Sequence, residues 1–114
     1  MPTDTATILR AARAKIDRPE CWTKDIFAKS RHGALIQMTQ DSRLLTARKY
    51  CAEAAVWAVT GDDINLAKVA LEKLRQCLRG GWAIIYDYND STETTHADIL
   101  ALYDRAIAAA EQSP

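Results

Sequence analysis

The chain has 114 residues, and its 15 basic residues balance 15 acidic ones to a formal net charge of zero. This length suits one globular domain, residues 1–114, with frayed tails at 1–4 and 111–114. The balanced charge lacks the basic excess of non-specific nucleic-acid binders and membrane-surface proteins, which argues against both partners. A net charge near zero also removes one barrier to self-association, so a homodimer or another protein partner stays open.

The three cysteines, Cys21, Cys51 and Cys77, lie far apart and form no C-x-x-C pair. This usage predicts reduced thiols in a cytoplasmic protein. The N-terminus lacks the basic and apolar segments of a signal peptide. The longest unbroken apolar run, residues 54–59, is far shorter than the roughly 20 residues that a membrane helix needs. We therefore predict a soluble protein.

The first predicted element is a helix that begins at Asp4 or Thr5, either of which can cap the opening turn. It runs to residue 17 or 18, because Pro19 disfavours helix in the residue before it. Its apolar positions recur every three to four residues and face the core; they are Ile8, Leu9, Ala12 and Ile16. Trp22, in the turn that follows, is expected to fold under this helix as a core side chain.

A β-hairpin is predicted next, over residues 26–36. Two short apolar runs, 26–28 and 34–36, flank a polar linker that contains Gly33. Such a glycine-containing linker between apolar runs is typical of a hairpin. His32 is then an exposed residue at the tip.

A second helix is predicted over residues 42–60. It begins amphipathic and becomes apolar on nearly every face through residues 54–59. A helix that is apolar all round is buried on several sides, so this one should be the central element. Gly61 suits the positive-φ position that ends a helix.

A third helix is predicted from Asp62 or Asp63, which can cap it, to Leu78. Its apolar stripe is regular and consists of Ile64, Ala67, Ala70, Leu71, Leu74, Cys77 and Leu78. Gly80-Gly81 stops it. Residues 82–86 are then aromatic and β-branched between glycines and a polar stretch, which favours a short strand beside the hairpin.

The last helix is predicted to begin at Thr95, with Asp98 three residues on as the acid of a capping box, and to run to Ala110. These elements together predict a mainly α fold, with about four helices packed around the second one. The hairpin and the strand at 82–86 would add a minor sheet.

With these segments in view, the chain resembles a family of short uncharacterised bacterial proteins known as a domain of unknown function. The resemblance rests on an N-terminal helix followed by a tryptophan turn, an aromatic-Cys pair followed by small residues, and an aromatic-Asn-Asp motif before a final helix. The matching segments are residues 9–13 with Pro19 and Trp22, residues 50–55, residues 88–90 with Thr95, and residues 99–107 with their Leu-x-x-Asp-Arg-Ala-Ile pattern. The family implies this fold but no activity.

The chain departs from that family pattern at four positions. Tyr50 and Tyr88 stand where the pattern has tryptophan, Ala54 stands where it has glycine, and Thr94 replaces a basic residue. An anion-binding or catalytic use of that basic position would therefore be lost here.

The stretch 86–96 gathers the most polar chemistry in the chain and is the candidate ligand site. Asn89 and Asp90 have a structural interpretation, because short polar side chains bond back to nearby backbone and end strands in turns. The functional alternative has Asn89 and Asp90 point into a shared cleft with His96 and with Tyr86 or Tyr88.

Arg105, on the last helix, is the remaining candidate of this site. We expect it to reach back to Asp90 or Asp87 and tie the loop to the helix. His96, in the first turn of that helix, is more simply an exposed residue or one beside the cap than a catalytic base.

We expect no cofactor, no metal and no catalytic residues. The spacing of two histidines and three cysteines resembles no zinc motif, and neither G-x-x-x-x-G-K-[ST] nor G-x-G-x-x-G occurs. Cys51 and Cys77 fall on core stripes, where a thiol behaves as a small hydrophobe, and Cys21 alone is expected to be partly exposed.

Three function classes stay open. The leading one is a small non-enzymatic binding or protein-interaction module, self-associating through an alanine-rich face. The second is a small-ligand binder or enzyme that uses the Asn89-Asp90 loop with His96. The third is a nucleic-acid-associated regulator, for which Arg43, Arg48 and Lys49 would have to form a basic face.

Overall fold

The computed structural model describes residues 4–61 and 63–112, which form five α-helices and a small three-stranded sheet. This confirms the mainly helical class with a minor sheet. The elements in chain order are α1 (Thr5–Lys15), the 3-10 helix η1 (Pro19–Cys21), β1 (Ala28–Lys29), β2 (Leu35–Ile36), the 3-10 helix η2 (Ser42–Thr46), β3 (Lys49–Tyr50), α2 (Ala52–Thr60), α3 (Ile64–Gln76), α4 (Ile85–Asp90) and α5 (His96–Gln112).

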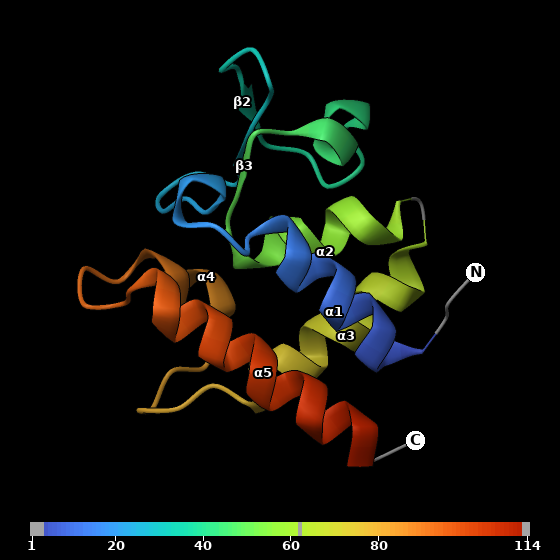
Figure 1. The fold of residues 1–114 in the computed structure, drawn as a ribbon, viewed down its shortest axis with the longest axis vertical. Coiled ribbons are helices and arrows are strands. Elements are labelled where there is room, and N and C mark those ends of the chain that lie inside the picture. The colour runs from blue at the N-terminus through green and yellow to red at the C-terminus, as the bar shows by residue number, and fades with distance from the viewer. Residues whose placement is uncertain (1–3, 62, 113–114) are drawn as a thin grey trace.

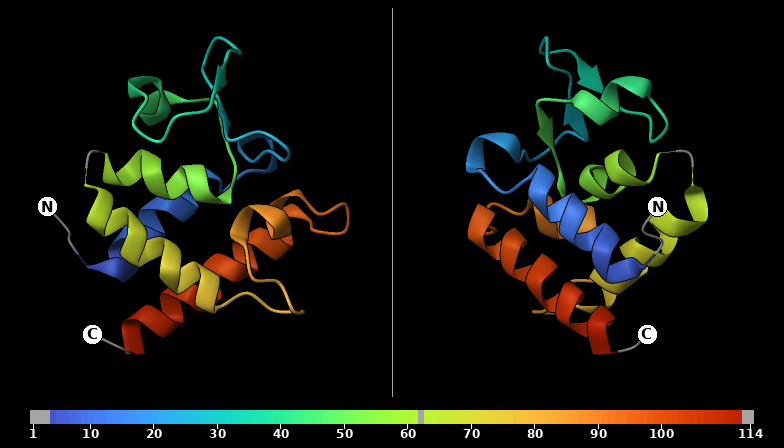
Figure 2. Two further views of the ribbon diagram at one scale, coloured as in Figure 1. Left: turned by 180° about the vertical axis from the view of Figure 1, so that it is seen from behind. Right: turned by 45° about the vertical axis from the view of Figure 1, so that its right-hand side comes forward.

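The helices form the main body, and the sheet with η2 stands beside it above α2 (Figure 1). In the other two views α1 runs alongside α5, while α2 and α3 meet at an angle (Figure 2). α2 contacts α1, α3, α4 and η2, whereas α5 packs mainly against α1 and α3, so the helices do not all pack around the second one as predicted. No helix in the described residues is long and apolar enough to cross a membrane.

α1 begins where predicted. The Asp4 carboxylate accepts a hydrogen bond from the backbone N–H of Ala6 at 3.0 Å, and the apolar stripe is buried as expected. The helix ends at Lys15, two or three residues early, with Ile16 as its C-cap. Asp4 caps α1 and residues 111–112 lie in α5, so these residues are not part of frayed tails. The rest of the predicted tails, residues 1–3 and 113–114, lies outside the described residues.

The single helix predicted over 42–60 is wrong. Residues 42–46 form η2, residues 49–50 form β3, and α2 begins only at Ala52. Tyr50 pairs with Ala28 across the sheet, and its hydroxyl donates to the Leu44 carbonyl at 2.7 Å. The backbone of residues 49–50 is paired with β1 in the sheet, so it cannot form the hydrogen bonds of a continuous helix. Gly61 ends α2 with φ of 57°, as predicted.

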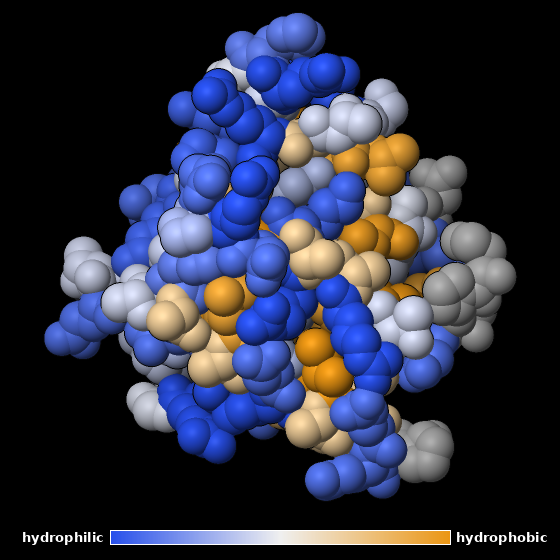
Figure 3. All heavy atoms as spheres, viewed as in Figure 1, coloured by the Kyte–Doolittle hydropathy of each residue, from blue (hydrophilic) through white to orange (hydrophobic). Residues whose placement is uncertain are grey.

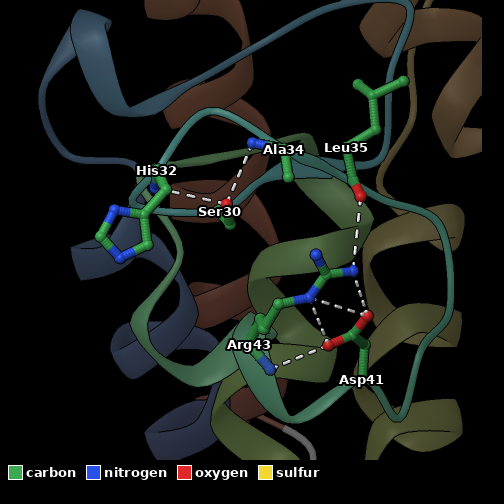
Figure 4. A network of polar contacts seen from close by, with 6 residues as sticks. All are labelled: Ser30, His32, Ala34, Leu35, Asp41 and Arg43. Atoms are coloured by element: carbon green, nitrogen blue, oxygen red, sulfur yellow. Dashed lines mark hydrogen bonds and ion pairs between the residues drawn. The ribbon is translucent and has the colours of Figure 1, made fainter.

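The hairpin is confirmed: Ala28 pairs with Ile36 and Lys29 with Leu35, antiparallel. The hydroxyl oxygen of Ser30 accepts hydrogen bonds from the N–H groups of His32 and Ala34 and holds the loop (Figure 4). His32 is exposed at the tip, as expected. β3 takes the other edge of β1, giving the order β2-β1-β3.

α3 and α5 begin at their predicted caps. The Asp63 carboxylate accepts from the N–H of Leu66, while Asp62 lies outside the described residues. Thr95 and Asp98 form a reciprocal capping box at 2.9 and 3.2 Å. α3 ends at Gln76 rather than Leu78, and Ile64, placed on the core stripe by its spacing, is 42% exposed.

The strand predicted over 82–86 is also wrong. Residues 82–84 form no regular element and Ile85 begins the six-residue helix α4. Ile85 and Asn89, one helical turn apart, are both buried. A helix places both side chains on one face, and this face packs into the core.

The surface seen in Figure 3 is mostly hydrophilic, and apolar side chains show in separate patches. The alanines of α2 are not among the exposed groups: Ala52, Ala54, Ala55 and Ala58 are all buried within the chain. The alanine-rich face proposed for self-association is therefore part of the core.

Candidate functional site

α4 carries four of the six candidate site residues. Because it is helical, residues four apart share a face. Ile85 and Asn89 turn inward and are buried, while Tyr86 is 54% exposed and Asp90 is partly exposed on the outer side. The two faces of this helix have different chemistry.

The inner face is organised by Asn89, whose side chain is 0% exposed. Its Oδ1 accepts from the indole Nε1–H of Trp22 at 2.7 Å and from the backbone N–H of Ala52 at 3.0 Å. Its Nδ2 donates to the Thr23 carbonyl at 3.0 Å and to Asp90 Oδ1 at 2.9 Å. All four bonding capacities of the amide are used within the chain. Asn89 has no polar atom left for a ligand.

Ala52, the first residue of α2, is held from both sides. Its N–H is bound by Asn89, and its carbonyl accepts from the buried hydroxyl of Tyr103 at 2.6 Å. Burial strongly raises the pKa of Tyr103, so its hydroxyl keeps the proton that it donates. α4 and α5 are thereby anchored to the start of α2.

Asp90 joins the inner network to the surface. Its Oδ1 also accepts from the backbone N–H of Asp25 at 2.8 Å. Asp25 has φ of 67°, a conformation that L-residues adopt uncommonly. The bond from Asp90 therefore helps to hold an unfavourable loop conformation beside α4.

The outer face borders a cavity of about 220 Å³, which we call the acidic pocket. It carries three carboxylates, from Asp25, Glu53 and Asp90, and no basic side chain; the whole lining is Asp25, Ile26, Phe27, Cys51, Glu53, Tyr86 and Asp90. A second cavity of about 380 Å³ is also lined by Glu53. It is lined by Glu53, Lys68, Leu71, Glu72, Arg75, Ala83, Ile84 and Ile85.

Glu53 was not predicted as a site residue. It forms no ion pair within the part of the chain that the structure describes. Burial raises the pKa of its carboxyl, the backbone N–H of Tyr86 partly offsets this, and the nearby charge of Asp90 raises the pKa further. One signal was present in the sequence: Glu53 is the only charged residue between Tyr50 and Thr60.

The Cys51 thiol also lines the acidic pocket but is not an activated nucleophile. It is 4% exposed, and burial raises its pKa to about 11. A nucleophilic cysteine needs a lowered pKa, so this thiol is protonated at neutral pH. Cys51 is buried as predicted, whereas Cys77, like Cys21, is partly exposed.

His96 does not line the acidic pocket. Its Nε2 lies 2.6 Å from the Ile16 carbonyl, which can only accept, so this nitrogen carries the proton. Its ring lies 5.9 Å from that of Trp22. His96 thus joins the start of α5 to the end of α1.

Arg105 and Tyr88 also lie away from the pocket. The predicted pairing of Arg105 with Asp90 or Asp87 is wrong: its guanidinium donates to the Cys77 carbonyl at 3.1 and 3.2 Å and caps the end of α3. The adjacent Asp104 pairs with Arg13 at 2.8 Å. Tyr88 is partly buried, and its ring lies 5.8 Å from that of Trp82.

The basic group at residues 43–49 is partly neutralised. The guanidinium of Arg43 pairs with Asp41 at 2.7 Å and reaches the Leu35 carbonyl (Figure 4). The same pairing lowers the pKa of Asp41 to about 2. Among residues 4–61 and 63–112, no group of three His, Cys, Asp or Glu side chains is arranged to hold a metal.

The comparisons with known proteins give one match. The model of a family of unknown function, DUF6197, matches residues 1–109, so the chain belongs to that family. No curated protein and no solved structure matches the chain.

Proposed function

We propose that this member of DUF6197 is a non-enzymatic protein-interaction module that binds a segment of a partner protein on the outer face of α4. One observation carries the proposal: two cavities meet at Glu53, and the exposed side chains of Ile84 and Tyr86 each border one of them. These side chains are 43% and 54% exposed. Exposed aromatic and aliphatic side chains beside pockets are typical of interaction sites.

The size of the cavities favours side chains over a cofactor. Small-molecule sites usually measure about 300–1,000 Å³. The acidic pocket, at about 220 Å³, is smaller, and the second cavity, at about 380 Å³, lies at the lower end of that range. Two neighbouring cavities of this size suit successive side chains of one segment.

The polar groups near the pocket support a binding role over a catalytic one. The side-chain amide of Asn89 makes all its hydrogen bonds within the chain, and His96 is hydrogen-bonded to the Ile16 carbonyl. The Cys51 thiol is protonated at neutral pH. Of the six candidates, Tyr86 and Asp90 are the two that line the acidic pocket.

The proposal takes residues 1–114 as one domain that acts in a bacterial cytoplasm. Support comes from the three free cysteines, which suit a reducing compartment. It also comes from the likeness to short bacterial proteins. A second copy of the chain is one form that the partner could take.

Affinity capture with matched variants tests the proposal. The bait is the full chain, compared with the double variant Ile84→Ser/Tyr86→Ser and with Leu45→Ser as control. Leu45 is 61% exposed on η2, away from α4. We expect a partner that the chain and the control retain and that the double variant loses, with at least about a 30-fold drop in affinity.

Two results would contradict the proposal. One is a partner that binds the double variant as well as the original chain. The other is no protein, a second copy included, whose binding depends on Ile84 and Tyr86 more than on Leu45. The native mass of the purified chain and of the double variant decides whether the partner is a second copy.

A further inference from the structure

The docking face on α4 has a distinct charge, although the whole chain is neutral. Asp25, Glu53 and Asp90 line the acidic pocket, and the exposed Asp87 lies on the same helix. The basic residue nearest in sequence, Lys24, does not line the pocket but lies beside it: its Nζ donates to the carbonyl of Ser91, the residue after Asp90, at 2.5 Å and lies 5.6 Å from the Trp22 ring. Its single positive charge offsets only part of the charge of these four carboxylates. Negative charge therefore gathers on one face of a neutral molecule.

These carboxylates lack cationic partners among the described residues. Glu53, Asp25 and Asp90 appear in no ion pair within residues 4–61 and 63–112. By contrast, Glu72 in the neighbouring cavity is paired with Arg75 on the same helix. The second cavity thus contains basic side chains beside its carboxylates, whereas the lining of the acidic pocket contains carboxylates and no basic side chain.

The remaining walls suit an organic cation. Tyr86 and Phe27 present aromatic rings, and Ile26 adds an aliphatic wall. Aromatic faces attract ammonium and guanidinium groups, and apolar walls accommodate the methylene stem of a long basic side chain. Carboxylates and aromatic rings around one small cavity are thus complementary to lysine or arginine.

We propose that the acidic pocket receives a lysine or arginine side chain of the partner segment, while Ile84 and the second cavity take a neighbouring apolar side chain. This inference rests on the function proposed above. The basic side chain enters between Glu53 and Asp90 and lies against Tyr86. Glu53 is the specificity-determining residue, because it borders both cavities and Asn89 does not hold it.

Blocked tripeptides test this occupant. The series is Leu-X-Leu with arginine, lysine, norleucine or glutamate at X, titrated into the full chain while backbone amide shifts are followed by NMR. We expect the arginine and lysine peptides to shift the amides of Glu53, Tyr86 and Asp90 and to bind at least 10-fold tighter than the norleucine peptide. The glutamate peptide should be the weakest.

Matched variants assign the effect to the pocket. Glu53→Gln should reduce the affinity for the arginine peptide to that for the norleucine peptide. The control Glu93→Gln removes the same charge from an exposed residue outside the pocket lining and should keep the preference. Equal losses in the two variants would show a diffuse charge effect and overturn the inference.

The other outcomes separate this inference from the proposed function. Equal binding of the norleucine and arginine peptides, still dependent on Ile84 and Tyr86, would overturn the basic occupant and leave the docking face standing. Binding of none of the peptides would overturn the inference, whereas the capture experiment would still judge the docking face. Free agmatine that binds as tightly as the arginine peptide would assign the pocket to a small organic cation and overturn the protein partner.

Discussion

The two faces of α4 differ in how their polar groups are satisfied. On the inner face, Asn89 is fully buried and makes four hydrogen bonds within the chain. The outer face borders an open cavity that is lined by Asp90 of α4 and Glu53 of α2, and these two carboxylates form no ion pair among the described residues. A buried polar group must be fully bonded or it destabilises the fold, whereas a group at a pocket can keep its capacity for a partner. The inner face is therefore structural, and the outer face is the candidate site.

The largest expected effect comes from removing the inner network. Asn89→Ala leaves the buried N–H of Ala52 and the partly buried indole N–H of Trp22 without their acceptor. We expect the free energy of unfolding to fall by about 3 kcal/mol. Urea denaturation measures it. Asp87→Ala, at an exposed position of the same helix, is the control and should change stability by less than about 0.5 kcal/mol. A loss below about 1 kcal/mol for Asn89→Ala would mean that this network is not what holds α4.

A second substitution acts on the other side of Ala52. Tyr103→Phe removes the hydroxyl that donates to the Ala52 carbonyl. It should lower the free energy of unfolding by about 1–2 kcal/mol, because one buried hydrogen bond is lost without a change of shape. Thermal or urea unfolding gives the value. Tyr86→Phe, which removes an exposed hydroxyl, should leave stability unchanged, and similar effects of the two would remove the distinction between the faces.

A third substitution tests the start of α5, which lies on neither face of α4. Thr95→Ala removes the hydroxyl that accepts from the N–H of Asp98. We expect a loss of about 1 kcal/mol, the usual contribution of an N-cap. Thr92→Ala, in the loop before the helix, is the control for the melting midpoint. An unchanged midpoint in Thr95→Ala would mean that the capping box does not stabilise α5 in solution.

The smallest expected effect has the opposite sign and comes from the outer face. Burial raises the pKa of Glu53, so its ionised form weakens the folded state at pH 7. Glu53→Gln should therefore raise the melting midpoint at pH 7, by about 2 °C. The difference should disappear as the pH falls below the ordinary carboxyl range, where Glu53 is neutral in both folded and unfolded chains. Melting curves from about pH 3 to pH 8 measure this, and a midpoint lowered at pH 7 would give Glu53 a stabilising role instead.

The sequence predicted best where signals are local. α1, α3 and α5 begin at Asp4, Asp63 and Thr95, each of which binds an N–H of the first turn. These caps and the apolar stripes behind them depend on residues within one or two turns. The predictions failed at 42–51, where the helix was extended too far towards the N-terminus, and at 82–86, where a short apolar run fits helix or strand equally well. Pairing with β1 determines the strand conformation of residues 49–50. Burial of Ile85 and Asn89 determines the helical conformation of residues 85–90.

The candidate site was partly predicted. Tyr86 and Asp90 were named, and the structure brings them to one cavity because α4 is helical and they are four residues apart. A strand ending in a turn would have grouped Tyr86 with Tyr88 instead. Glu53 was missed because it lies 33 residues before Tyr86, and no local pattern joins them.

From the sequence alone come the helical class, the hairpin, the three well-capped helices and the family, since these rest on neighbouring residues or on the pattern of the whole chain. The tertiary structure decided which polar residues are available to a partner. Asn89, Asp90 and Glu53 are all short polar side chains in or beside apolar segments, and composition does not distinguish them. Trp22, Thr23 and Ala52, from distant parts of the chain, saturate Asn89, whereas Glu53 and Asp90 are partly exposed and line the acidic pocket. Hydrogen-bond partners that are far apart in sequence, rather than residue type, determine which face of α4 is structural and which is free to bind.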